Sequence, residues 1–295
     1  MKKIATAIAL TLSMSGALAQ AADAIPEVKM DQALHDRLPE DIKSSGKMIS
    51  VNNGSFPPYE IVTGPQSMDG ASADLAVALG QLLGVKIEHA TVSGLPGLLA
   101  GIKSGRYQLA IGPVGDYPDR QEKNDFIDFV QEFVVFGVLK GNPAGINGLP
   151  DTCGKRIAVM AGGSAEQVIR NQSKACTDAG KPAVTVQSFT DQPSSILAVR
   201  SKRSDAFFSS QAPLTYFVEQ AHGALELTAE GQKNGFSDIF QGTVVAKNSP
   251  LEKVVLDAYK ELFNNGTYAA IMKKWQLSDN MIKQPGVNLA KEMPK

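Results

Sequence analysis

Two long apolar runs constrain the fold of this chain more than any other feature. The first covers residues 129–140 (FVQEFVVFGVLK), and the second covers residues 239–247. The segment GNPAGINGLPD follows the first run directly, and its glycines and prolines predict a loop. We interpret the two runs as paired crossings between two lobes, with the second lobe inserted into the first.

Strand-like and helix-like segments alternate on both sides of the first crossing. Apolar runs predict strands at residues 48–51, 85–91, 107–111, 156–160, 183–189 and 205–208, and amphipathic spacing predicts helices at residues 72–84, 95–104, 194–201, 213–221, 251–264 and 267–275. This order is typical of βαβ units around a parallel sheet. We therefore expect an α/β fold in which lobe 1 comprises residues 44–137 and 243–295 and lobe 2 comprises residues 138–242. A loop-rich tail is expected after residue 277.

The N-terminus has the features of a secretory signal peptide at residues 1–19. Lys2 and Lys3 precede an apolar run at residues 4–12, and Ala17-Leu18-Ala19 offers a small-residue cleavage pattern. The run is shorter than the roughly 20 residues that cross a bilayer. We expect export to the periplasm, with a polar lead-in at residues 20–43 that contains one short helical turn.

The charge balance and the cysteines narrow the class of protein. The chain has 29 Lys and Arg against 30 Asp and Glu, a net charge of −1, so no basic surface for nucleic acid is expected and a small molecule is the expected partner. Cys153 and Cys176 are the only cysteines. In an exported protein such a pair predicts a disulfide, with two free thiols as the alternative; no metal site is expected, because no histidine lies nearby.

A candidate anion site follows the strand expected at residues 107–111. The apolar run stops at Gly112, Pro113 and Gly115, which predicts a strand that opens into a loop where a ligand can approach the backbone. Arg120 comes next, and its planar, permanently charged guanidinium suits a carboxylate or a phosphate. A surface ion pair is the alternative interpretation.

Two further segments carry candidate ligand contacts. Phe56 and Tyr59 flank a proline pair at the end of the first strand, where aromatic rings either stack on a ligand or pack in the core. In AGGSAEQ, Gly163 precedes Ser164, a residue suited to cap a helix, and Glu166 falls in the first turn. Open amides at such a helix start bind anions, so Ser164 and Arg120 are expected to face each other across a cleft.

Catalytic motifs are sparse. The three histidines lie in unrelated contexts, and no GxSxG, P-loop, GxGxxG or HExxH pattern occurs. We therefore expect no catalytic residues, no metal and no cofactor.

Several blocks in order resemble one protein family. These are SSGKMISVNNGSFPPYE, SADLAVALGQLLGVKIE, LLAGIKSGRYQLAIGPVGDYPDRQEKNDFIDF, CGKRIAVMAGGSAEQ, RSDAFFSSQAPLTYFVEQ and KELFNNGTYAAIMKKWQL. They resemble the extracellular solute-binding proteins of family 3, the periplasmic receptors of polar amino-acid ABC importers. The resemblance implies the type II periplasmic-binding-protein fold, two crossover strands as a hinge, a monomer that traps its ligand between lobes, and a membrane permease as partner.

The resemblance also implies roles for single residues. Phe56 is similar to the aromatic residue that stacks on the ligand, Arg120 to the arginine that binds the α-carboxylate, and Ser164 to a donor from the second lobe. The chain departs from the family pattern elsewhere. Gly115 and Tyr117 stand where Ser or Thr contacts are usual, Ser210 where an Asp receives the α-ammonium, and Asn53 where binders of cationic amino acids often have Asp.

These departures bear on the ligand. An ammonium beside a neutral serine loses a charge-assisted hydrogen bond worth about 1.5–3 kcal/mol. The ligand is therefore either a small carboxylate whose polar end is neutral or differently placed, or an amino acid whose ammonium is received by another acid such as Glu60 or Glu166.

An enzyme on the same fold is the alternative function. GGSAE, which ends at Glu166, is similar to a turn in a periplasmic cyclohexadienyl (prephenate or arogenate) dehydratase, where a glutamate serves as general acid. A glutamate that merely interacts with the helix dipole is the simpler interpretation.

Overall fold

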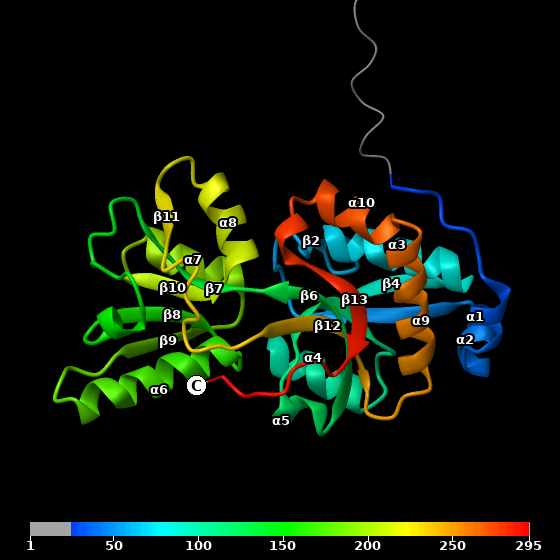
Figure 1. Cartoon of the computed structure of the whole chain (residues 1–295), viewed down its shortest axis with the longest axis horizontal. Helices are drawn as coiled ribbons and strands as arrows, with labels where there is room; N and C mark the ends of the chain where they lie inside the picture. Colours follow the sequence, from blue (N-terminus) through cyan, green and yellow to red (C-terminus); the bar gives the residue numbers. More distant parts are fainter. Residues whose placement is uncertain (1–24, 295) are drawn as a thin grey trace, which may run out of the picture.

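Two α/β lobes lie side by side in the computed structural model, which describes residues 25–294 (Figure 1). The expected signal peptide lies outside these residues. No helix within residues 25–294 has the length and apolar character needed to cross a membrane.

Lobe 1 is built on an antiparallel four-stranded sheet. Its strands, in spatial order, are β13 (Met281–Val287), β6 (Asn124–Glu132), β12 (Ile239–Ala246) and β5 (Ala110–Gly115). A parallel pair, β1 (Lys47–Asn52) and β4 (Lys86–Thr91), joins β5 through a bridge between Ser50 and Leu109. The remaining elements are α1 (Gln32–Asp36), α2 (Glu40–Ser45), β2 (Ile61–Gly64), β3 (Ser67–Asp69), α3 (Ala71–Leu83), α4 (Gly94–Lys103), α5 (Pro118–Gln121), α9 (Leu251–Asn264) and α10 (Thr267–Lys274).

Helix α3 illustrates why the sequence folds this way in lobe 1. Its buried leucines recur at helical spacing, at Leu75, Leu79 and Leu83, and so form one apolar face toward the core. The helix ends at Gly84, which adopts the left-handed conformation (φ +65°) that favours glycine. In the same core, Phe129 of β6 stacks on Tyr259 of α9 with ring centroids 5.3 Å apart.

Lobe 2 is built on a mixed five-stranded sheet. Its strands, in spatial order, are β11 (Leu225–Thr228), β7 (Val134–Leu139), β10 (Ala206–Ser210), β8 (Arg156–Met160) and β9 (Thr185–Phe189). Strands β8, β9 and β10 are parallel, whereas β7 and β11 run antiparallel to their neighbours. Helix α6 (Ser164–Asp178) packs on one face, and α7 (Gln192–Arg200) and α8 (Gln211–Gln220) pack on the other.

The predicted disulfide between Cys153 and Cys176 is confirmed. It links α6 to the segment that follows a short 3₁₀ helix (Leu149–Thr152) and leads into β8. The bond thereby holds the longest helix of lobe 2 against its sheet.

The two crossings lie next to each other between the lobes (Figure 1). β6 ends at Glu132 and β7 begins at Val134, so the chain changes lobe at Phe133, and β12 returns in register with β6 through the pair Ile239 and Glu132. The crossings therefore lie at residues 133 and 239, a few residues before the expected boundaries at 137 and 243. The hydrogen-bond partner changes inside the first run and at the start of the second, so the extent of a run does not mark that point.

The expectation of a loop at Gly112–Gly115 is wrong. β5 continues to Gly115, because β12 pairs with it through Gln241 and Gly242. Pro113 is tolerated because this part of β5 forms an edge of the four-stranded sheet, where a missing N–H costs no ladder hydrogen bond.

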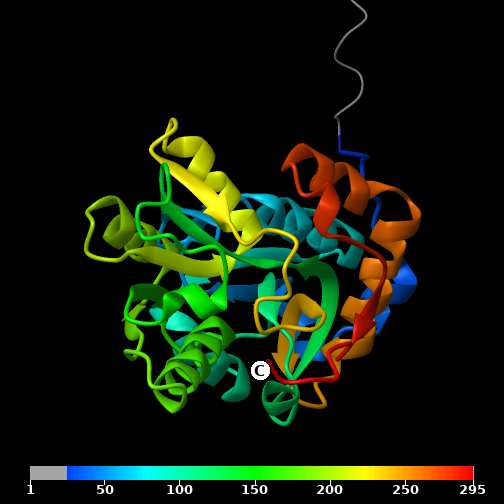
Figure 2. The ribbon, with the colours of Figure 1, turned by 60° about the vertical axis from the view of Figure 1, so that its left-hand side comes forward.

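Six elements were not expected from the sequence. These are α1, β2, β3, α5, β11 and β13. β13 pairs with β6 inside the tail that was expected to be loop, and the segment after it runs back toward lobe 2 and ends near α6 (Figures 1 and 2).

Candidate functional site

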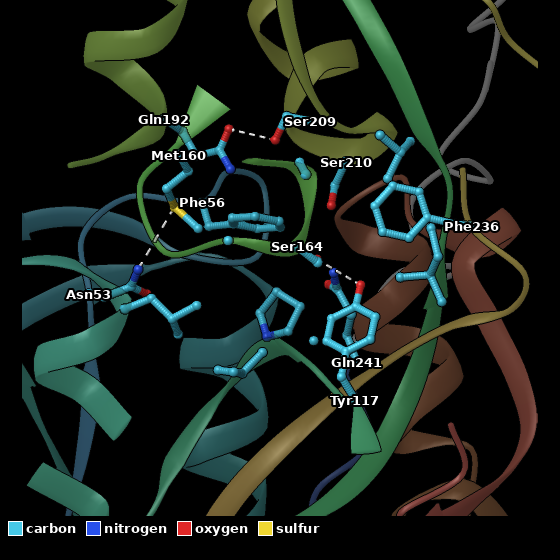
Figure 3. Close-up of a pocket in the computed structure, with 18 of the residues that line it drawn as sticks. Asn53, Phe56, Tyr117, Met160, Ser164, Gln192, Ser209, Ser210, Phe236 and Gln241 are labelled. Atoms are coloured by element: carbon cyan, nitrogen blue, oxygen red, sulfur yellow. Dashed lines mark hydrogen bonds between the residues drawn. The ribbon is translucent and has the colours of Figure 1, made fainter. Parts of the chain in front are cut away.

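A pocket of about 670 Å³, including its opening to solvent, lies between the lobes (Figure 3). Lobe 1 contributes Asn53, Phe56, Glu60, Leu95, Pro113, Val114, Gly115, Tyr117, Arg120, Ile239 and Gln241, and lobe 2 contributes Val134, Met160, Gly163, Ser164, Ala165, Gln192, Ser209, Ser210 and Phe236. Eight of the nine residues expected to bind ligand line this pocket, namely Asn53, Phe56, Gly115, Tyr117, Arg120, Gly163, Ser164 and Ser210.

Arg120 brings a positive charge to the pocket wall. Its Nη1 donates to the Gly115 carbonyl at 2.8 Å, its Nη2 reaches the Gly162 carbonyl of lobe 2 at 3.4 Å, and its guanidinium lies 5.0 Å from the Tyr117 ring centroid. No carboxylate forms an ion pair with this side chain within residues 25–294. Burial lowers the pKa of Arg120, but a guanidinium remains charged in proteins. The charge is therefore available to an anionic ligand.

The start of α6 faces Arg120 from lobe 2. Gly163 occupies the N-cap position and Ser164 is the first helical residue, so the expectation that Ser164 caps the helix is wrong by one position. Its side chain is instead directed across the cleft, where Ser164 Oγ donates to the Tyr117 hydroxyl at 2.9 Å (Figure 3). The free amides and dipole of a 15-residue helix favour an anion here.

Phe56 and Glu60 form one wall of the pocket. The Phe56 amide donates to the Glu60 carbonyl at 2.8 Å and the Glu60 amide donates back at 3.0 Å. Residues in such a directly opposed pair place their side chains on the same face. Glu60 is only 4 % exposed, and burial raises the pKa of its carboxyl to about 8.

Tyr59, the ninth residue expected to bind ligand, does not line the pocket. It is fully buried in the lobe 1 core, where its hydroxyl donates to Glu132 Oε1 at 3.0 Å. Tyr59 belongs to the turn that joins the bridge partners Phe56 and Glu60, and its ring packs into the core while Glu60 lines the cleft. The prediction of a ligand contact at Tyr59 is therefore wrong.

Neutral polar groups complete the lining, and several of them were not expected. Gln192 Oε1 accepts from Ser209 Oγ at 3.0 Å, and Asn53 Nδ2 lies 3.9 Å from Met160 Sδ (Figure 3). Gln241 Oε1 is buried without a donor. Two of these residues could have been found from the sequence. Ser209 lies at the carboxyl end of β10, where ligands commonly bind in α/β sheets. Gln241 is a polar residue within an apolar run.

Glu166 lies outside this pocket, in a groove that adjoins it. It accepts hydrogen bonds from the Gly162 amide at 2.7 Å, from Ser188 Oγ at 2.6 Å and from Arg170. Burial raises its pKa, but these bonds outweigh that effect and hold the pKa below its usual value. Glu166 is therefore an ionised, fully engaged carboxylate.

Comparisons with known proteins agree with this geometry. A family model for bacterial extracellular solute-binding proteins, family 3, matches residues 48–278. The arginine-binding protein ArgT of Corynebacterium glutamicum is 23% identical over 271 residues, which cover 90% of this chain and 84% of the relative. The L-cystine-binding protein TcyJ of Escherichia coli K12 is 26% identical over 239 residues, which cover 79% and 84%.

Solved structures share the two-lobed fold. An ancestral arginine-binding protein bound to arginine matches with a TM-score of 0.68 and 29% identity, over 78% of this chain and 98% of that one. The ancestral amino acid-binding protein AncCDT-1, a precursor of cyclohexadienyl dehydratase, matches with a TM-score of 0.69 and 21% identity, over 80% and 97%. Both matches extend over almost the whole length of the solved chains.

Proposed function

Because this chain belongs to the bacterial extracellular solute-binding proteins of family 3, we propose that it is a periplasmic receptor of an ABC importer. It captures a small carboxylate, an amino acid or an amino-acid-like compound, between its two lobes and delivers it to a membrane permease. The observation that carries this proposal is the unpaired Arg120 guanidinium, which faces the start of α6 across the cleft.

The carboxylate of the ligand binds between Arg120 and the start of α6. The guanidinium offers charged donors from lobe 1, while Ser164 and the free amides after Gly163 offer donors from lobe 2. Charge-assisted hydrogen bonds to a carboxylate are about twice as strong as bonds between neutral groups. The anion end of the ligand therefore supplies much of the affinity and contacts both lobes at once.

Lobe closure follows from contacts that join the lobes around this site. Ser164 reaches Tyr117, Arg120 reaches the Gly162 carbonyl, and Asn53 approaches Met160. A ligand held by donors from both lobes binds the closed arrangement better than an open one, and so shifts the population toward it. The paired strands β6 and β12 provide the hinge for this movement.

The contacts of Glu166 support a receptor over a dehydratase. A general acid needs a proton at the working pH, whereas Glu166 is ionised and engaged with Arg170, Ser188 and the Gly162 amide. It also lies outside the pocket lined by Arg120.

A ligand screen tests the proposal. Purified protein is heated with single amino acids, small organic acids, arogenate and prephenate, and the midpoint of unfolding is measured for each. A ligand that binds only the folded protein raises the midpoint by mass action. A rise with at least one small carboxylate, without turnover, is the expected result; no rise with any carboxylate, or conversion of prephenate, contradicts it.

A further inference from the structure

The carboxyl of Glu60 is a buried acid without a partner in the cleft. It is the only acidic side chain among the pocket-lining residues, and no hydrogen bond or ion pair to its carboxyl occurs within residues 25–294. Burial is the sole cause that raises its pKa to about 8. Buried polar groups in proteins are nearly always paired, so an unpaired carboxyl that faces a ligand pocket points to a donor supplied by the ligand.

The neighbours of Glu60 leave room for such a donor. The carboxyl packs on Gly112 of β5, where a Cβ would lie 3.0 Å from Glu60 Cδ, so the glycine makes space for this acid. Phe56 presents its ring on the same side of the Phe56–Glu60 bridge. A carboxylate beside an aromatic ring is a suitable environment for a cation.

We propose that Glu60 and Phe56 form a cation site, and that the ligand is an ω-amino or ω-guanidino carboxylate whose carboxylate binds at Arg120. This inference rests on the proposed function and specifies the chemical class of the ligand. In this proposal the Arg120 guanidinium binds the carboxylate end of the ligand, and the Glu60 carboxyl binds its cationic end.

The spacing along β5 separates the two ends. Gly112 supports the Glu60 carboxyl, and the Gly115 carbonyl holds Arg120 Nη1. These positions are three residues apart, or about 10 Å along an extended strand. The charges of an α-amino acid sit on adjacent carbons and cannot reach both groups, whereas a cation several bonds from the carboxylate can.

The anion end of the pocket has only neutral acceptors for an α-ammonium. The polar residues that lobe 2 adds to the lining are Ser164, Gln192, Ser209 and Ser210, and none of them carries a charge. An α-ammonium would be buried without a carboxylate, which is unfavourable. The lining therefore favours a ligand whose only cation is remote from its carboxylate.

Binding of a cation at Glu60 releases a proton at neutral pH. The empty site holds a protonated carboxyl, and the bound site holds a carboxylate. The other titratable groups that line the pocket are Arg120 and Tyr117, which bond to the Gly115 carbonyl and to Ser164. The hydroxyl of Tyr59, next to Glu60 in the chain, bonds to Glu132 instead. None of these groups bonds to the Glu60 carboxyl. Affinity for a ω-amino acid should therefore rise with pH up to about 8 and then level off.

Isothermal titration calorimetry on the full mature protein tests the proposal. The probes are ω-amino acids from β-alanine to ε-aminocaproate, each matched with the ω-hydroxy acid of equal length, and norvaline as an α-amino acid. At least one ω-amino acid should bind roughly 10- to 100-fold more tightly than its hydroxy partner and than norvaline. Titration in buffers of different ionisation enthalpy should detect about one proton released at pH 7.

Two variants separate a specific role of Glu60 from damage to the fold. Glu60→Gln should reduce the preference for the amine to a few-fold and abolish proton release, whereas Glu261→Gln, an exposed position on α9, should change neither. The proton count of the unmodified protein provides a test that needs no variant.

The possible failures are distinguishable. If ω-hydroxy acids or norvaline bind as tightly as every ω-amino acid, or no proton is released, the cation site is contradicted while the receptor function stands. If no carboxylate of any kind binds, both the cation site and the proposed function are contradicted.

Discussion

Ser164 Oγ and the Tyr117 hydroxyl lie 2.9 Å apart and join the two lobes next to Arg120. Ser164 starts the helix that faces the pocket, and Tyr117 immediately precedes α5, which carries Arg120. The same serine is proposed to donate to the ligand carboxylate. The Tyr117–Ser164 bond therefore stabilises the closed arrangement in the absence of ligand, and it can be exchanged for a ligand bond without moving the lobes.

Removal of the Tyr117 hydroxyl should loosen the empty protein. Tyr117→Phe deletes an interlobe hydrogen bond that contributes about 1 kcal/mol. Small-angle X-ray scattering should give a larger radius of gyration for the ligand-free variant than for the ligand-free parent. With saturating ligand the two should have the same radius; an identical radius in both states would show that this bond does not control closure.

Loss of the Arg120 guanidinium should abolish ligand binding without unfolding the protein. Arg120→Ala removes the charged donors at the anion end, and we expect affinity for any carboxylate to fall by roughly 100-fold. Calorimetric titration measures the loss. Arg106→Ala, at an exposed arginine of lobe 1, is the matched control; full affinity in the Arg120 variant would place the anion site elsewhere.

Removal of the disulfide should destabilise lobe 2. Cys153 and Cys176 are 23 residues apart, and closing such a loop contributes on the order of 3 kcal/mol in the chain-entropy estimate. The double variant Cys153→Ser/Cys176→Ser should unfold at a lower urea concentration than the oxidised parent. An unchanged midpoint would mean that the packing of α6 alone holds this part of the lobe.

A buried carboxyl pair should make stability depend on pH. Asp116 and Asp128 are fully buried, and burial together with the charge of Asp116 raises the pKa of Asp128 to about 9. The unfolded chain loses this proton near pH 4, so the native state holds one more proton between about pH 4 and pH 9. The contribution of Asp128 to stability is therefore complete below pH 4 and is lost as the pH rises to about 9, at no more than about 1.4 kcal/mol per pH unit.

The variant Asp128→Asn tests whether the Asp128 carboxyl makes the protein less stable as the pH rises. The amide mimics the protonated acid and can still accept from the Leu289 amide. The stability of the variant relative to the parent, measured by urea unfolding, should increase from pH 5 to about pH 9 and then level off. For Asp69→Asn, at an exposed position, the difference in stability between variant and parent should not change with pH. If the difference for Asp128→Asn also does not change with pH, the Asp128 carboxyl is ionised in the native protein.

Most of the fold could be predicted from the sequence because apolar periodicity reflects burial. The spacing of the α3 leucines and a glycine at the expected cap position, Gly84, predicted that helix almost to the residue, and α9 was predicted with its observed bounds. β13 could not be found in this way. Only one of its seven residues is buried, so they carry no strong apolar alternation, and only pairing with β6 makes it a strand.

The site was less predictable where it depends on the direction of a side chain. Phe56 and Tyr59 look equivalent in the sequence, but the Phe56–Glu60 bridge turns one toward the cleft and the other into the core. Gly112 and Gly115 suggested a loop, whereas pairing with β12 keeps them in a strand. Such choices arise from contacts between distant segments, which a local pattern does not encode.

The C-terminal segment has a practical consequence for measuring ligand capture. The Leu289 and Ala290 amides are held by Asp128 and Asp116, while Met293 and Pro294 line the groove beside the start of α6 (Figure 2). Residues 289–290 are thus anchored to lobe 1, and residues 293–294 lie beside the start of α6 in lobe 2. A solvent-sensitive fluorophore attached at Met293 would report lobe movement optically, which would turn the protein into a reagentless sensor for its own ligand.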